Sequence, residues 1–384
     1  MKQTKLPVYL MLLATLSAGS CSNEDTPDTP YNPSNDPDAV ELGVTAGVAL
    51  TKSAINQGTD DTNFKNIAVY AVGGTTSYTT GNNYALYKKN GSWANTGSDK
   101  IYLTNETATI YGYHPAYTPE TGGVMTSATT TPLKLSSTVT ESSTIPVTVF
   151  PGTPGSKDAN NTIPATDNSS GIAILSAPGE VDYMWAEDAD NNGNPATASN
   201  GKAAGSPDAS VALKMKHAMA MVSFRIYNDG TYANTGKLTK IVLKNKGNTA
   251  LSQGTDPVMA IKDGAITSGT EKTVTFTRYI GNGYILKKQG AVGLTVTDAA
   301  KGASSKFSIL VLPHNGAKNT IQVEFTIDNT VYAVDLAANA DAVNWAKGTN
   351  TLYTAKLSGK DLTLSSVTVE KWGDGAATGE LPVN

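Results

Sequence analysis

Strict alternation of apolar and polar residues constrains this chain more than any other feature of its sequence. Between residues 40 and 50 every second position is apolar: Val40, Leu42, Val44, Ala46, Val48 and Leu50. A period of two residues predicts a β-strand with one buried face. Further short strands, separated by Gly and Pro turns, are predicted at 67–72, 100–103, 107–113, 145–150, 218–227, 238–244, 273–277, 307–312, 320–327 and 330–336. Short strands without a long helical period indicate an all-β protein built from sandwiches.

Composition narrows the class of protein further. Only 16% of the 384 residues are charged and the net charge is −4. This excludes a coiled coil, which is rich in Glu and Lys, and leaves no basic surplus for a nucleic-acid partner. The length is sufficient for two domains, and a polar stretch at 187–207 predicts the boundary between them.

The N-terminus has the form of an export signal. Lys2 and Lys5 precede an apolar run at 6–16, and small residues at 17–20 lead directly to Cys21. This arrangement predicts a signal peptide at 1–20 that is too short to remain as a membrane span. Cys21 occupies the position of the lipidated residue in a bacterial lipoprotein. A plain signal peptide cleaved near Ser20, with Cys21 incidental, is the alternative.

The segment at 21–39 contains no large aliphatic residue and is rich in Asn, Pro and Asp. It cannot build a core, so we expect an acidic, disordered tether. Because Cys21 is the only cysteine, the chain forms no internal disulfide and depends on packing.

Lys52 is the first Lys or Arg after Cys21. A trypsin-like protease acting on the mature chain would meet it first and cut between Lys52 and Ser53. The cut would release the tether and the whole first strand. The alternative is an ordinary first strand followed by a loop lysine.

Motifs for catalysis and for metal binding are weak. The three histidines, His114, His217 and His314, lie about a hundred residues apart, and a zinc site built from them is open only in principle. The run 188–193 matches the first half of a calcium loop, but its twelfth position is Ser199 and Pro195 blocks the following helix. We therefore expect no metal site, no catalytic residues and no cofactor.

Aromatic residues and carboxylates leave two other functions open. Tyr78, Tyr84, Tyr87 and Trp93 can offer stacking faces for sugars, although packing between strands is their expected use. Carboxylate pairs for glycoside hydrolysis leave no local signature. A surface glycan-binding lipoprotein and a lipid-anchored glycoside hydrolase are thus the alternatives.

Several segments together resemble the fimbrillin family of Bacteroidales pilins. They are the lipoprotein signal, the run 214–222 (KMKHAMAMV), the strand 309–313 (ILVLP), and the C-terminal NWAKG at 344–348, Tyr353 and VTVEKWGDG at 367–375. The resemblance implies two transthyretin-like β-sandwich domains in tandem, here expected at 40–207 and 208–384, and no enzyme activity. It implies a lipidated precursor in the outer membrane whose first strand, 40–51, is removed by a trypsin-like protease. The family usually has Arg at the cut, where this chain has Lys52.

The chemistry of strands supports the same mechanism. Removing the strand exposes a groove and leaves backbone hydrogen-bonding groups unpaired. A strand from another subunit can fill the groove and pair with these groups. Each subunit then donates and accepts, which builds a head-to-tail polymer. We expect the donor near the C-terminus, among Leu362, Leu364, Val367, Val369, Leu381 and Val383. The expected partners are other pilin subunits, the protease, the outer membrane, and a host or bacterial surface ligand for the fimbrium.

Overall fold

The computed structural model describes residues 36–48, 64–73, 77–119, 131–135, 138–165, 174–191, 193–246, 251, 254–270, 274–291, 299–317, 320–336, 342–372 and 378–382. Strands make up nearly all the regular structure in these residues, and the one helix among them is α1 (Ala299–Ala303). The expected all-β class is therefore confirmed. The tandem transthyretin-like topology stays a prediction.

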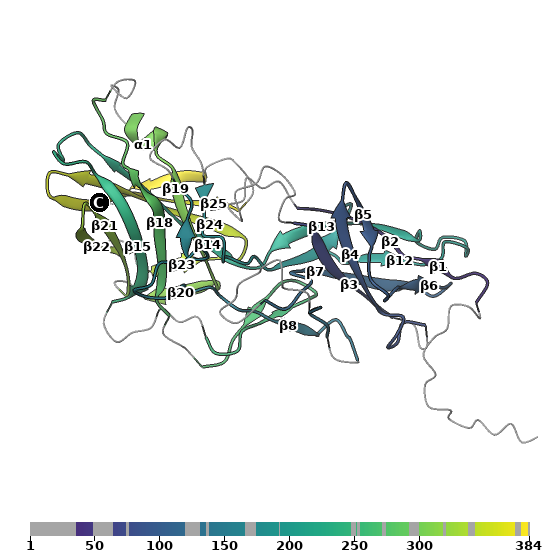
Figure 1. Cartoon of the computed structure of the whole chain (residues 1–384). Coiled ribbons are helices and arrows are strands. Elements are labelled where there is room, and N and C mark those ends of the chain that lie inside the picture. The colour runs from purple at the N-terminus through teal and green to yellow at the C-terminus, as the bar shows by residue number, and fades with distance from the viewer. Residues whose placement is uncertain are drawn as a thin grey trace, which may run out of the picture.

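The first sheet contains the N-terminal strands and lies to the right in Figure 1. It has eight strands in the order β2-β13-β11-β7-β3-β4-β5, with β12 paired to β7. Their bounds are β2 (Gly43–Val48), β13 (Ser210–His217), β11 (Met184–Asp188), β7 (Ala108–His114), β3 (Asn66–Val72), β4 (Tyr84–Asn90), β5 (Ser92–Asn95) and β12 (Ala196–Ala198). A two-stranded ribbon, β1 (Val40–Glu41) with β6 (Tyr102–Leu103), covers one face.

The second sandwich packs two sheets face to face. The first has the order β10 (Ile174–Leu175), β19 (Lys306–Val311), β14 (Ala220–Asn228), β24 (Thr349–Ser358), β25 (Asp361–Lys371) and β26 (Thr378–Pro382). The second has the order β22 (Thr330–Leu336), β21 (Ile321–Ile327), β15 (Lys237–Asn245), β18 (Phe276–Ile285) and β9 (Thr162–Ile163). Phe224 on β14 and Phe325 on β21 meet edge to face between them, with ring centroids 5.6 Å apart. This core is continuous and apolar, as the alternation predicts.

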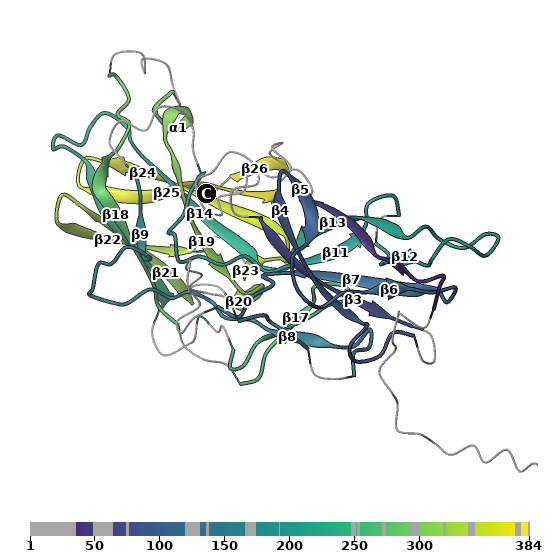
Figure 2. The same cartoon turned by 45° about the vertical axis from the view of Figure 1, so that its right-hand side comes forward.

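Two smaller sheets lie between and beside these layers. One contains β17 (Ile266–Thr267), β16 (Val258–Ala260) and β8 (Thr144–Pro146), and the other contains β20 (His314–Ala317) and β23 (Ala342–Trp345). A third apolar cluster joins Tyr113 and Trp185 of the first sheet to Leu310 and Trp372 of the second sandwich. The two halves therefore lie end to end with a shared buried junction (Figures 1 and 2).

Two strands that precede residue 207 in the sequence already belong to the second sandwich. β9 pairs in parallel with β18, and β10 pairs in parallel with β19, so both belong to the second sandwich. β13 pairs with β2 and β11 in the first sheet, although it follows residue 207. The division at 207/208 stays a prediction about folding units, and the sheets exchange strands across it.

A buried arginine fastens this crossover. The side chain of Arg278 donates from Nε to Glu180 at 2.6 Å and from Nη2 to the carbonyl of Phe150 at 2.6 Å, and both charged groups are buried. The strand predicted at 145–150 ends instead at Pro146. The prediction was wrong there because the backbone carbonyl of Phe150 bonds to a side chain rather than to a neighbouring strand.

Most of the other predicted strands are present with small shifts. β3, β7, β14, β15, β19, β21 and β22 coincide with predicted strands to within one or two residues at each end. β18 begins at Phe276, near the end of the strand predicted at 273–277.

Candidate assembly site

β2 is an edge strand of the first sheet, and among the strands that the structure describes it pairs with β13 alone. The two run parallel, with Gly43 opposite Ser210 and Val48 opposite Met215. The amide of Gly43 donates to the carbonyl of Ala209 at 2.8 Å. The first strand of the sequence is thus held by a strand far along the chain.

The inward face of β2, together with Leu42 directly before it, follows the predicted alternation. Leu42 is 2% exposed and Val44 is 6% exposed, and both belong to the core beneath the first sheet. Ala46 and Val48 are partly buried against the same core. Val40 differs, since it lies in β1 and is 36% exposed. Its position at the end of the segment, beyond the sheet, explains why it escapes burial.

The outer edge of β2 is closed by two aromatic side chains. The Tyr87 hydroxyl donates to the carbonyl of Leu42 at 2.6 Å, and Trp93 Nε1 donates to the carbonyl of Ala46 at 2.7 Å. Burial, with a smaller contribution from Glu41, raises the pKa of Tyr87 well above its usual value. The phenol therefore stays protonated and keeps its donor role.

Several expected functional residues lie outside the described part of the chain. They are Cys21, Leu50, Lys52, Ser53 and Val383. Lipidation at Cys21 and cleavage after Lys52 therefore stay predictions.

The next basic residue after Lys52 is fixed beside the sheet. Lys65 has an exposed side chain, but its carbonyl accepts a hydrogen bond from the amide of Lys89 at 2.9 Å. Its peptide bond is thus part of a paired backbone, which proteases bind poorly because they require an extended, unpaired substrate.

The C-terminal candidate residues divide into two groups. Leu362, Leu364 and Val367 of β25 pack against the core of their own sandwich, whereas Val369 is exposed. β26 forms the edge of the six-stranded sheet, with Leu381 opposite Val367. β25 is therefore committed to its own core, and among the described strands β26 pairs with β25 alone.

The aromatic residues that could serve sugars are packed instead. Tyr78, Tyr84 and Tyr87 are buried. Trp93 is partly buried, and its indole N–H donates a hydrogen bond to β2. Lys134 covers the ring of Tyr84 with its ammonium 4.7 Å from the centroid. The expected packing role of these residues is confirmed.

The histidines do not come together as one site. His217 donates from Nδ1 to Asp182 at 2.5 Å, and His114 donates from Nδ1 to the carbonyl of Asn66 at 2.8 Å. His314 lies beside Trp345, with ring centroids 5.7 Å apart. Among the described residues, no three His, Cys, Asp or Glu side chains gather closely enough to hold a metal ion.

The loop that resembles half a calcium site is closed by the protein's own groups. The amide of Gly193 donates to Glu187 at 2.9 Å, and the amide of Asp190 donates to Asp188 at 2.9 Å. Lys216 adds an ion pair to the same buried Glu187 at 2.7 Å. These contacts form a turn on the end of β11.

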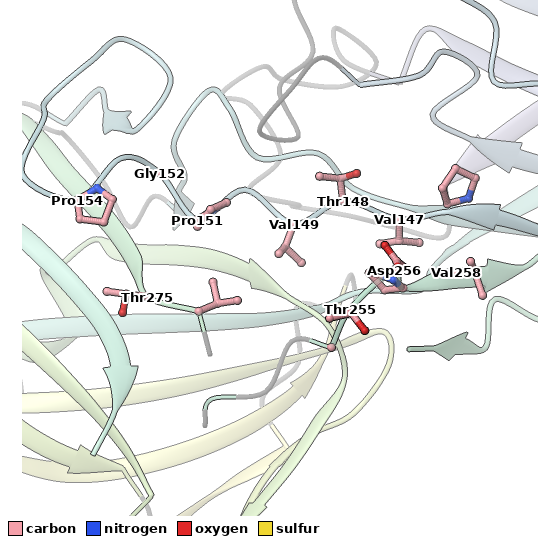
Figure 3. A pocket seen from close by; sticks show the side chains of 14 residues that line it. Val147, Thr148, Val149, Pro151, Gly152, Pro154, Thr255, Asp256, Val258 and Thr275 are labelled. Atoms are coloured by element: carbon pink, nitrogen blue, oxygen red, sulfur yellow. The ribbon is translucent and has the colours of Figure 1, made fainter. Parts of the chain in front are cut away.

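An apolar groove of about 730 Å³ lies beside the crossover segment. Its walls come from residues 146–154, 254–258 and 274–275, and Figure 3 shows Val149 facing the wall that carries Thr255 and Thr275. Among the described residues of its lining, Asp256 is the single carboxylate. Glycoside hydrolysis uses two carboxyl groups about 5–10 Å apart, and the described lining supplies one.

Sequence reasoning missed two buried clusters. One is the Arg278–Glu180 pair, and the other is Asp182 with His217 and Trp372, whose rings stack at the junction of the two halves. Their members are far apart in sequence, so no local spacing could reveal them.

Comparison with known proteins places this strand-rich chain in a family. A family model described as fimbrillin-like matches residues 51–372, so the chain belongs to the fimbrillin-like family. The family is one of fimbrial and cell adhesion proteins, which places the chain at the cell surface. The comparison with curated proteins gave no match.

Solved structures from three Bacteroides species are similar to this chain at low sequence identity. A protein assigned to cell adhesion from Bacteroides uniformis has 18% identity over 87% of this chain and 99% of its own, with a TM-score of 0.48. A second one, from Bacteroides ovatus, has 14% identity over 87% and 97%, with a TM-score of 0.49. A fimbrial protein from Bacteroides vulgatus has 12% identity over 86% and 99%, with a TM-score of 0.43.

No helix among the described residues has the length and apolar character needed to cross a bilayer.

Proposed function

We propose that this chain is a pilin subunit of an adhesive surface fimbrium, assembled by removal of the first strand and insertion of a strand from a neighbouring subunit. The observation that carries the proposal is the placement of β2. It is an edge strand that buries Leu42 and Val44 in the first core, and it precedes the rest of the sheet in sequence. A single cut after it therefore frees an apolar slot without opening any other strand connection.

The free energy of strand docking is large enough to drive assembly. Full burial of a Leu or Val side chain contributes about 1.5–3 kcal/mol, so Leu42 and Val44 together contribute several kcal/mol before ordering costs. The slot keeps the backbone edge of β13 and its apolar lining after β2 leaves. A second strand with the same alternation can recover the free energy of apolar burial that is lost with β2.

The range of the family match agrees with this division of the chain. The match at 51–372 excludes both β2 and β26. These are the two segments that the proposal removes and exchanges. The donor is then the segment 376–384, since β25 is held in its own core.

The lipid and the protease complete the proposal. Cys21 anchors the precursor to the outer membrane through its lipid, and a trypsin-like protease cuts between Lys52 and Ser53. The cut separates the subunit from its anchor and starts polymerisation. Adhesion then depends on a host or bacterial surface ligand of the assembled fimbrium.

Limited trypsin digestion of the purified full-length protein tests the proposal. The expected result is a chain that begins at Ser53 and forms a ladder of oligomers on a gel without reduction or boiling. Lys52→Ala should leave β2 attached and the protein monomeric. Lys65→Ala is the matched control and should be processed and assembled like wild type.

Two results would count against the proposal. N-terminal sequencing that places the cut far from Ser53 would remove Lys52 from its role. Efficient loss of β2 with a chain that stays monomeric under all conditions would remove strand exchange.

A further inference from the structure

Two side chains hold β2 by its backbone alone. In a strand, the N–H and C=O of one residue point to the same side and adjacent residues point to opposite sides. Gly43 points toward β13, where its amide meets Ala209. Leu42 and Ala46 therefore direct their carbonyls to the outer edge, where Tyr87 and Trp93 bind them.

These contacts contain no side chain of β2. Both acceptors are main-chain oxygens, four residues apart and so separated by about 13 Å along the strand. Any extended segment lying along β13 presents carbonyls at this spacing. The recognition is thus independent of sequence, while the inward pockets select apolar residues.

The two donors are positioned by parts of the chain that remain after cleavage at Lys52. Tyr87 is held within β4, opposite Ile67 of β3 and Asn95 of β5. The indole of Trp93 meets the ring of Phe64 edge to face, with centroids 5.2 Å apart. Neither side chain depends on β2 for its backbone support.

Departure of β2 removes both acceptors at once. The hydroxyl of Tyr87 is buried, and a buried donor without a partner is costly. The vacated slot therefore retains two directed donors on one side and the backbone edge of β13 on the other. Such a slot fits an extended strand.

We propose that Tyr87 and Trp93 form a strand clasp, which binds the backbone carbonyls first of β2 and then of an extended segment from a second copy of the chain. The identity of that incoming segment rests on the proposed function. The clasp limits sliding along β13 to steps of two residues, because every second carbonyl of an extended segment points to the two donors, and the inward apolar pockets select among these registers. Tyr87 and Trp93 are positioning residues for assembly.

Peptide binding to the processed protein tests the clasp without requiring polymerisation. Trypsin-treated full-length protein is separated from its released strand and titrated with a labelled peptide of residues 40–51. Tyr87→Phe and Trp93→Phe should each weaken binding about fivefold, as expected for one lost hydrogen bond. Tyr78→Phe is the control, since it loses a bond of similar length, 2.7 Å to the carbonyl of Glu106, and the 3.2 Å bond that Tyr78 accepts from the amide of Thr104, neither of which involves β2.

Hydrogen exchange on the uncut protein gives a second measurement. The amides of residues 43–48 should exchange severalfold faster in Tyr87→Phe and Trp93→Phe than in wild type and Tyr78→Phe. This measurement remains informative if a variant precipitates after cleavage.

The outcomes separate the clasp from the proposed function. Peptide binding that depends on Tyr87 and Trp93, in a protein that never polymerises, supports the clasp and removes the pilin assembly. Wild-type peptide affinity and exchange rates in both variants overturn the clasp, whether or not the protein polymerises. Preferential binding of a soluble oligosaccharide over the peptide also overturns it.

Discussion

The imidazole of His217 lies flat against the indole of Trp372, with ring centroids 4.0 Å apart and planes 3° apart. His217 ends β13 of the first sheet, and Trp372 directly follows β25 of the second sandwich. The stack therefore joins the two halves of the molecule at the place where the chain leaves toward β26.

Trp372→Ala should weaken this junction. Removal of a buried Trp side chain costs about 3–5 kcal/mol in unfolding free energy, and the loss should appear in urea denaturation followed by circular dichroism. Trp372→Phe should cost less because a stacked ring remains. Equal stability of Trp372→Ala and wild type would show that the indole does not hold the two halves together.

Leu42 and Val40 form a matched pair on the first strand. Leu42→Ala should lower the unfolding free energy by about 2 kcal/mol or more, since the side chain is buried. Val40→Ala should change it by less than about 0.5 kcal/mol, since Val40 is exposed. Urea denaturation of the uncut protein measures both. Comparable losses would mean that the strand is not bound in this register.

Deletion of residues 376–384 should reduce assembly and leave the monomer folded. The deletion removes β26 from the edge of β25, while Leu362, Leu364 and Val367 remain packed. Circular dichroism should therefore be unchanged, and the trypsin-induced oligomer ladder should shorten. Charged replacements at Leu381 and Val383 should act similarly, because a buried unpaired charge is costly.

A substitution in β25 provides the contrast to that deletion. Leu364→Asp should destabilise its own sandwich and lower expression of folded monomer.

Normal polymers from the protein that lacks residues 376–384 would place the donor upstream, within 362–369, or would indicate a tip subunit that accepts a strand and donates none.

His114 should make stability depend on pH. Burial lowers the pKa of His114 below its usual 6.5, with opposing effects from the Asn66 carbonyl and Asp182 and a further lowering by His217. The unfolded chain therefore binds a proton near pH 6.5 while the folded protein does not. The stability from this group is complete above pH 6.5 and is lost as the pH falls through the folded pKa.

The size of this effect follows from proton linkage. Wild type should lose up to about 1.4 kcal/mol per pH unit from His114 between pH 6.5 and the folded value. His114→Gln should show a correspondingly smaller difference in unfolding free energy between pH 7.5 and pH 5.5. Identical pH profiles would assign the acid sensitivity to other groups.

Cys21→Ala should separate export from attachment. Without the thiol no lipid can be joined, so the variant should accumulate as soluble or unprocessed precursor. Fractionation of cells into membrane and soluble portions measures the change. A variant that partitions with outer membranes like wild type would contradict the anchor.

The sequence predicts the local features of the first strand well. Alternation identifies Leu42 and Val44 as inward residues because burial on one face of a strand has a period of two. It does not reveal that Val40 lies beyond the sheet, since exposure at a strand end depends on where the partner strand stops.

The partners of that strand were beyond the reach of sequence patterns. Parallel pairing of β2 with β13 joins distant segments, and parallel strands require no nearby turn signal. Tyr87 and Trp93 are visible as aromatic residues, but their acceptors on Leu42 and Ala46 are main-chain atoms that carry no mark in the sequence. The crossing of β9 and β10 into the second sandwich is concealed for the same reason.

The parallel pairing of β2 with β13 also fixes an order of events during folding. β2, near the start of the chain, cannot pair with β13 until residues 210–217 have been synthesised. Closing so long a loop is entropically unfavourable and slow, so β2 docks after β3, β4 and β7 have paired locally. A strand that joins the sheet last is also the strand whose removal breaks the fewest pairings, since β3, β4 and β7 remain bonded to one another without it.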